Sequence, residues 1–180
     1  MKDKLIVFDR DGTLIRYKPY LHMTKDVELL EGVKEVLKKL KENGNKLFLH
    51  TNQSGVSRGY YSLNDVVRCN NKMINILGLG KNIFEKICIA HDYPPNKNSY
   101  RKPSPRFGRE IIHKYNVNIS SLIYIGDNIS DLQTAKNIGC LAYGVDSGVK
   151  NLKSKLKKSK IFNFPVYKNM CEFNKNLLDG

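Results

Sequence analysis

Short apolar runs alternate along the chain with segments whose apolar residues recur at helical spacing. The runs have the length and residue types of buried strands and occupy residues 5–8, 46–50, 84–89, 122–125 and 140–145. Between the first two runs, residues 32–43 place apolar side chains three and four positions apart, ahead of Gly44, a residue suited to ending a helix. This pattern predicts a helix that packs one face on a sheet.

Start and stop signals predict three more helices. Ser62 and Asp65 form a capping pair, and Ser104 with Pro105 begins the next helix, because proline is tolerated in a first turn. The last of the three runs from near Ile129 to Gly139. Strands separated by helices in this way predict a three-layer α/β/α fold of Rossmann-like type with a mainly parallel sheet.

Polar residues follow the predicted strands where each strand ends. In chain order they are Asp9 and Asp11, then Thr51, Asn52 and Gln53, then Arg101 and Lys102, then Asp127 and Asp131. Parallel strands bring their carboxyl ends to one edge of a sheet, where such folds bind ligands. Carboxylates gathered there suit a hard cation such as Mg²⁺, and the hydroxyl, amide and cationic donors complement phosphate oxygens. The combination predicts phosphoryl transfer.

These residues, in this order, resemble the four motifs of the haloacid dehalogenase superfamily of aspartate-based phosphatases. The motifs match at residues 9–13 (DRDGT), at Thr51, at Lys102, and at residues 126–127 (GD) with Asp131. The stretches FDRDGTL, TNQSGVSRG and RKPSP are similar to the capless subfamily III branch, which contains heptose-bisphosphate 7-phosphatases and histidinol-phosphate phosphatases. The resemblance covers residues 4–148 and implies the superfamily's fold without a cap domain.

The resemblance also implies a catalytic role for the motif carboxylates. Asp9 is the expected nucleophile, which forms an aspartyl-phosphate, and Asp11 is the expected general acid and base. Mg²⁺ is expected at the Asp9 carboxylate, the Asp11 backbone carbonyl and Asp127, with Asp131 in support. From the residues alone, Asp131 could instead be a first-turn partner of a helix dipole.

Phosphate and substrate contacts are expected from the second and third motifs. The resemblance implies that Thr51 and Lys102 hold the transferring phosphate and that Asn52 and Arg101 contact the substrate. Gln53 either contacts the substrate or braces its loop. Residues 14–30 could supply a short flap at the edge of the pocket.

The resemblance implies a heptose 1,7-bisphosphate as the substrate, with hydrolysis of the 7-phosphate in heptose precursor biosynthesis. Arg10 and the loop TNQSGV favour this substrate, although Arg10 could also be a surface residue whose stem lies on the sheet edge. The alternatives are histidinol phosphate, a polynucleotide 3′-phosphate, which Tyr100 before Arg101 and the basic charge favour, and a non-catalytic binding module. The intact motifs argue against that module.

A structural zinc site is not expected, although relatives in this branch carry a four-ligand one. Cys88 and His91 remain as candidate ligands, but the second pair is replaced by residues 98–100 (NSY). The loop 92–100 must therefore be ordered by its own hydrogen bonds or by the substrate. The four cysteines are far apart and predict no disulfide framework.

Length and charge set the remaining expectations. The 180 residues suit one domain, with a motif-bearing core at 4–148, a basic linker at 149–160 and a C-terminal edge strand and helix at 161–180. The net charge of +14 keeps nucleic acid possible as a partner, but the dispersed lysines favour a solvated basic surface. With no membrane-length apolar segment and no signal peptide pattern, we expect a cytoplasmic monomer or weak dimer without a membrane partner.

Overall fold

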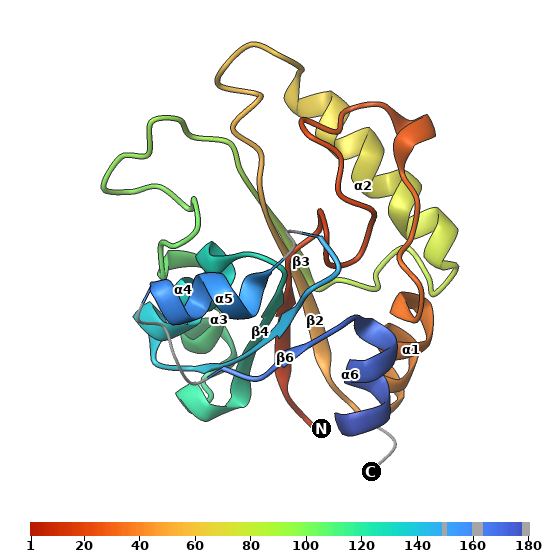
Figure 1. The fold of residues 1–180 in the computed structure, drawn as a ribbon, viewed down its shortest axis with the longest axis vertical. Coiled ribbons are helices and arrows are strands. Elements are labelled where there is room, and N and C mark those ends of the chain that lie inside the picture. The colour runs from red at the N-terminus through yellow and green to blue at the C-terminus, as the bar shows by residue number, and fades with distance from the viewer. Residues whose placement is uncertain (149–150, 160–163, 178–180) are drawn as a thin grey trace.

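A parallel sheet of six strands, in the order β3-β2-β1-β4-β5-β6, runs through the centre of the molecule (Figure 1). The structure is a computed structural model that describes residues 1–148, 151–159 and 164–177. The strands are β1 (Leu5–Phe8), β2 (Lys46–Asn52), β3 (Lys86–Ala90), β4 (Leu122–Gly126), β5 (Leu141–Val145) and β6 (Val166–Tyr167). The prediction of a mainly parallel sheet is confirmed.

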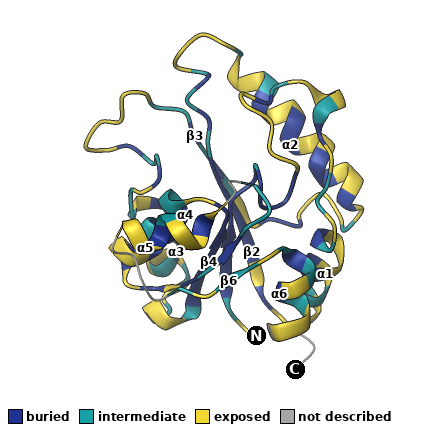
Figure 2. Cartoon of the chain, in the orientation of Figure 1, coloured by how far each residue is buried: buried dark blue, intermediate teal, exposed yellow. Residues whose placement is uncertain are grey.

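Helices cover both faces of this sheet. They are α1 (Val33–Glu42), α2 (Leu63–Leu77), α3 (Arg106–Tyr115), α4 (Ile129–Ile138), α5 (Leu152–Lys158) and α6 (Met170–Leu177), with the short 3₁₀ helices η1 (Thr24–Asp26) and η2 (Ile119–Ser121). Because strand side chains alternate, Ile6 and Phe8 of β1 pack against α1, α2 and α6, while Leu5 and Val7 pack against α3, α4 and α5. Figure 2 shows the buried sheet between helices whose outer sides are exposed.

The predicted element boundaries agree with the structure to within about two residues. Ser62 and Asp65 form a reciprocal capping box at the start of α2, and Gly139 ends α4 in a left-handed conformation. β3 begins at Lys86 rather than at residue 84, because Phe84 enters the core from the preceding loop. β2 continues to Asn52, two residues past its predicted end.

The basic linker predicted at 149–160 is corrected by the structure, which has helix α5 within its described part. Leu152 and Leu156 stand four positions apart, so one face of the helix is apolar, and both side chains are buried against the sheet. The lysines between them occupy the outer side. A lysine-rich run therefore conceals a short amphipathic helix.

The C-terminal segment supplies the edge of the sheet and a last helix, as predicted. β6 pairs in parallel with β5, and Phe173 of α6 is fully buried in the same core as α1. The parts of this prediction at 161–163 and 178–180 lie outside the described residues. None of the described helices is both long enough and apolar enough to cross a lipid bilayer.

The segment between β1 and α1 folds back over the carboxyl end of the sheet. Ile15 forms isolated bridges with Asp11 and Leu29, and η1 packs against α2. Leu14 and Ile15 are fully buried, whereas Tyr17 and Tyr20 are each 49% exposed. This segment is too short for a separate domain, so the carboxyl ends of the central strands remain accessible from outside.

Candidate active site

A cavity of about 380 Å³ lies at the carboxyl ends of the central strands. Its walls include seven of the nine predicted site residues: Asp9, Asp11, Asn52, Arg101, Lys102, Asp127 and Asp131. Tyr17, Asn128 and Ser130 complete the lining. The other two predicted residues, Thr51 and Gln53, are buried beside it. The structure thus brings together residues that follow four different strands.

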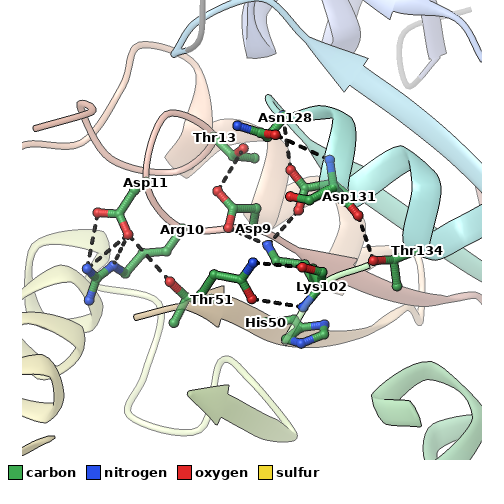
Figure 3. Close-up of polar contacts among 12 residues, drawn as sticks. Asp9, Arg10, Asp11, Thr13, His50, Thr51, Lys102, Asn128, Asp131 and Thr134 are labelled. Atoms are coloured by element: carbon green, nitrogen blue, oxygen red, sulfur yellow. Dashed lines mark hydrogen bonds and ion pairs between the residues drawn. The ribbon is translucent and has the colours of Figure 1, made fainter. Parts of the chain in front are cut away.

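Lys102 forms the centre of a buried charge cluster (Figure 3). Its Nζ lies 2.6 Å from Asp9 Oδ1 and 2.5 Å from Asp131 Oδ1. Burial alone would lower the pKa of Lys102, but the carboxylates of Asp131 and Asp9 outweigh it and raise that pKa. The side chain therefore stays a cation inside the protein.

Three buried carboxylates face one another beside this cation. Oxygens of Asp9, Asp127 and Asp131 all lie within 4.8 Å of one another. Carboxylate oxygens are hard ligands, and three of them gathered this closely in a buried place fit a divalent cation. Asp131 also accepts a hydrogen bond from the backbone N–H of Asn128 at 3.0 Å and so caps α4.

Two glycines bring their backbones against Asp127. A Cβ at Gly12, whose φ is +91°, would lie 2.4 Å from Asp127 Oδ2, and a Cβ at Gly148 would lie 2.2 Å from the same atom. The Ser147 hydroxyl donates a hydrogen bond to the Gly12 carbonyl at 2.7 Å. The loop after β5 therefore belongs to the site, although no sequence motif marks this loop.

The Asp11 carboxylate is turned away from the charge cluster (Figure 3). Its Oδ2 accepts hydrogen bonds from Gln53 Nε2 at 2.9 Å and from the Thr51 hydroxyl at 3.4 Å. Burial raises the pKa of Asp11, and the Arg10 guanidinium opposes this rise. The carboxylate is not a member of the three-carboxylate cluster, so only the backbone carbonyl of Asp11 remains available for the predicted metal contact.

Arg10 is fully buried, with 0% exposure, which contradicts the alternative of a surface side chain. Its Nε and Nη2 donate to the two oxygens of Asp11 at 3.0 and 3.1 Å, and its Nη1 donates to Asn70 Oδ1 at 2.9 Å. Arg10 lines neither the main cavity of about 380 Å³ nor the neighbouring one of about 270 Å³, which shares Asp11, Tyr17 and Asn52 with it. Asn70 was also missed. The available signal was the place of Asn70 on the apolar stripe of α2, four positions from Val66 and four from Ile74.

Side chains of β2 hold the backbone of the segment that carries Lys102. The Asn52 amide donates to the Lys102 carbonyl at 3.1 Å, and its oxygen accepts from the Lys102 N–H at 2.9 Å. His50 Nε2 hydrogen-bonds the Tyr100 carbonyl at 2.8 Å. Asn52 lines the cavity, but both ends of its amide are engaged with Lys102.

The loop before Lys102 is held by side chains of the loop that follows β2. The Arg58 guanidinium lies 3.6 Å from the centre of the Tyr93 ring, and the Ser57 hydroxyl donates to the His91 carbonyl at 2.5 Å. Cys88 is packed in the core, where burial raises the pKa of its thiol to about 12. Within the described ranges, Cys88 and His91 belong to no group of metal-ligand type.

Tyr100 contributes to this order rather than to the cavity. Its hydroxyl donates to Glu110 Oε1 at 2.6 Å, and the Arg106 guanidinium lies 4.2 Å from its ring centre. It lines neither the main cavity nor its neighbour. The residue that favoured a polynucleotide substrate therefore does not face the site.

Comparison with known proteins decides the family. The model of the haloacid dehalogenase-like hydrolase family matches residues 13–145. The chain belongs to the haloacid dehalogenase-like hydrolases. Among curated proteins, it is 32% identical over 146 residues to the D-glycero-beta-D-manno-heptose-1,7-bisphosphate 7-phosphatase of Haemophilus ducreyi, covering 77% of this chain and 80% of that protein. The predicted fold class is confirmed, and this haloacid dehalogenase-like hydrolase is a phosphatase.

Two further relatives cover nearly the whole of this hydrolase. The D-glycero-alpha-D-manno-heptose-1,7-bisphosphate 7-phosphatase of Campylobacter jejuni is 30% identical over 172 residues, covering 96% of this chain and 94% of that protein. The crystal structure of D,D-heptose 1,7-bisphosphate phosphatase from B. bronchiseptica, complexed with magnesium and phosphate, superposes with a TM-score of 0.86 at 26% identity and covers 98% of each chain. The similarity therefore extends beyond the motif-bearing core to the C-terminal elements.

Proposed function

We propose that this protein is a Mg²⁺-dependent phosphatase that removes the 7-phosphate of D-glycero-D-manno-heptose 1,7-bisphosphate through an aspartyl-phosphate on Asp9. The observation that carries this proposal is the buried contact between Asp9 and Lys102 at the wall of the cavity. A carboxylate beside a fixed ammonium group can attack a phosphorus atom whose oxygens the same ammonium group binds.

The metal site in this proposal consists of the side chains of Asp9, Asp127 and Asp131 with the backbone carbonyl of Asp11. The close, buried grouping of these three carboxylates supports a divalent cation there. When bound, Mg²⁺ supplies positive charge that offsets the charge of the phosphate and of the nucleophile. The magnesium in the similar B. bronchiseptica structure supports the choice of this ion.

The proposed chemistry assigns a task to each residue around Asp9. Asp9 attacks the phosphorus, the bond to the sugar oxygen breaks, and a proton from the Asp11 carboxyl goes to that oxygen. Asp11 then takes a proton from the water that hydrolyses the aspartyl-phosphate. Lys102 and Thr51 stabilise the phosphate charge in both steps. The raised pKa of Asp11 fits a group that must carry a proton in the first step.

A bisphosphate substrate is supported by the donors at the cavity wall. Arg101 lines the cavity next to Lys102, and its Nη1 is buried with no hydrogen-bond partner among the described residues. Arg58 and Arg101 both lie near the ring of Tyr93, at 3.6 and 5.7 Å from its centre. Two guanidinium groups close together, one of them with an unused donor, suit a second phosphate group.

Phosphate release and ³¹P nuclear magnetic resonance test this proposal. Both anomers of the heptose bisphosphate are assayed with Mg²⁺. We expect at least one of them to lose a single phosphate from C7 and leave the 1-phosphate. Histidinol phosphate and a 3′-phosphorylated oligonucleotide should be poor substrates. Chelation of Mg²⁺ should stop turnover, and calorimetry should detect weaker Mg²⁺ binding in Asp127→Asn.

Asp9→Asn tests the nucleophile. We expect kcat to fall by at least about 10³-fold, because an amide does not form the covalent intermediate. Asp3→Asn is the matched control: Asp3 is exposed at the opposite end of the sheet and should leave kcat unchanged. Faster turnover of the oligonucleotide than of the heptose would refute the substrate, and full activity in Asp9→Asn would refute the mechanism.

A further inference from the structure

Arg10 holds the Asp11 carboxylate at both of its oxygens. Nε donates to Oδ2 at 3.0 Å and Nη2 donates to Oδ1 at 3.1 Å, so the planar guanidinium prevents rotation of the carboxylate. On its far side, Nη1 donates to Asn70 of α2 at 2.9 Å, which anchors the guanidinium to an element outside the motifs. Thr51 of β2 and Gln53, the residue after β2, also donate hydrogen bonds to the Asp11 carboxylate.

The location of the held carboxylate is specific. A second cavity of about 270 Å³ adjoins the first, and Asp11, Tyr17 and Asn52 line both. The Asp11 side chain is 18% exposed, whereas that of Arg10 is 0% exposed. Asp11 therefore presents an edge to the junction between the cavity that contains Asp9 and Lys102 and the cavity between Tyr17 and Tyr61.

This junction is where the leaving oxygen must lie if the transferred phosphate occupies the first cavity beside Asp9 and Lys102 and the sugar carbons enter the second, with the other phosphate at Arg101. A proton donor is useful there only if it keeps its position while the bond to the leaving oxygen breaks. A buried guanidinium loses its hydration, which costs free energy of folding. Its hydrogen bonds to Asp11 and Asn70 offset this cost. An apolar side chain of similar length would fill the same space but would not orient the carboxylate.

We propose that Arg10, anchored by Asn70, is a positioning residue that fixes the Asp11 carboxyl at the junction of the two cavities for proton transfer to the leaving oxygen. The inference rests on the proposed function, in which Asp11 is the general acid. Arg10 itself does not touch the substrate. In the step it supports, Asp9 forms a bond to phosphorus, the phosphorus–oxygen bond to the alcohol breaks, and the Asp11 proton moves to that oxygen.

Leaving-group dependence tests this role. The ratio kcat/KM reports the steps up to the first irreversible one, and 4-nitrophenyl phosphate releases a phenolate that needs no proton, whereas an alkyl phosphate does need one. For Arg10→Met we expect kcat/KM to fall about 100-fold with the heptose bisphosphate and less than about threefold with 4-nitrophenyl phosphate. Arg10→Lys should recover part of the loss, because lysine can still contact Asp11 at one point.

Asn70→Leu is the second variant, because Arg10→Met could fail to fold. It removes only the anchor of Arg10 and should produce the same substrate-selective loss at about one tenth of the size. In the background of Asp11→Asn, Arg10→Met should cause no further loss with either ester. Circular dichroism and the thermal midpoint establish which variants are folded.

The outcomes separate this inference from the proposed function. Turnover of both esters by the natural protein, lost in Asp9→Asn, supports the phosphatase. Equal losses on both esters in the folded Arg10 and Asn70 variants would then overturn the positioning role alone, and so would no loss on either ester. A natural protein that hydrolyses neither ester would overturn the proposed function and this inference with it.

Discussion

His50 differs in protonation between the folded and the unfolded chain. Its ring is fully buried on β2, where Nε2–H donates to the Tyr100 carbonyl and Nδ1 lies 3.4 Å from the Tyr124 hydroxyl. Burial and, to a smaller extent, the nearby Lys102 ammonium group lower the pKa of His50 to about 3. An exposed histidine binds a proton near pH 6.5. Between these values the unfolded chain binds a proton that the folded chain does not.

We therefore expect His50 to make the folded state less stable as the pH falls from about 6.5 toward 3. Its contribution to the free energy of unfolding should decrease by up to about 1.4 kcal/mol per pH unit. His50→Gln keeps an N–H donor for Tyr100 and should remove this part of the slope in urea unfolding curves measured across the pH range. His113→Gln, at an exposed position, should keep the full slope. Equal slopes in the natural protein and His50→Gln would contradict the assignment.

Individual residues also mark how far the sequence could predict the site. Asp9, Lys102 and Asp127 were predictable because each follows its own strand, and parallel strands end at the same edge. Arg10 was not, since an arginine after a strand is usually exposed, and only the folded chain brings Asn70 of α2 to it. The order of residues does not reveal Asn70, the hydrogen-bond partner that helps to stabilise the buried Arg10 guanidinium.

Helix α5 was missed as an element for a physical reason. Its exposed positions are mostly lysine, so the average composition is typical of a linker, and only Leu152 and Leu156 indicate an apolar face. Longer helices such as α1 and α2 repeat their apolar stripe over more turns and were predictable. Short elements with two apolar positions do not contain enough of the periodic signal.

The burial of Leu152 gives a testable consequence for α5. Leu152→Ala should lower the free energy of unfolding by about 2–4 kcal/mol, because a fully buried side chain beneath the sheet leaves a cavity when shortened. Chemical denaturation measures this change. Lys153→Ala, at the exposed neighbouring position, should change it by no more than about 0.5 kcal/mol. Similar stabilities for Leu152→Ala and Lys153→Ala would contradict the packing of α5.

The charge of the whole molecule affects how it meets an anionic substrate. The net charge is +14, so the field around the protein attracts an anion from a distance. We expect kcat/KM to fall as ionic strength rises, and to fall more steeply for the bisphosphate than for a monophosphate, because salt screens the attraction in proportion to substrate charge. Initial rates in a sodium chloride series, at fixed Mg²⁺, measure both slopes. Equal slopes would contradict long-range attraction.

The close approach of Gly12 to the loop after β5 bears on how the protein is made. The hydroxyl of Ser147 reaches back 135 positions to the Gly12 carbonyl, and Lys102 reaches back 93 positions to Asp9. A ribosome adds about 5–20 residues per second, so the first aspartates leave it many seconds before their partners. A nascent chain that ends before this loop lacks one wall around Asp127. Recovery of activity in a translation reaction would therefore report the completed chain rather than its early folding.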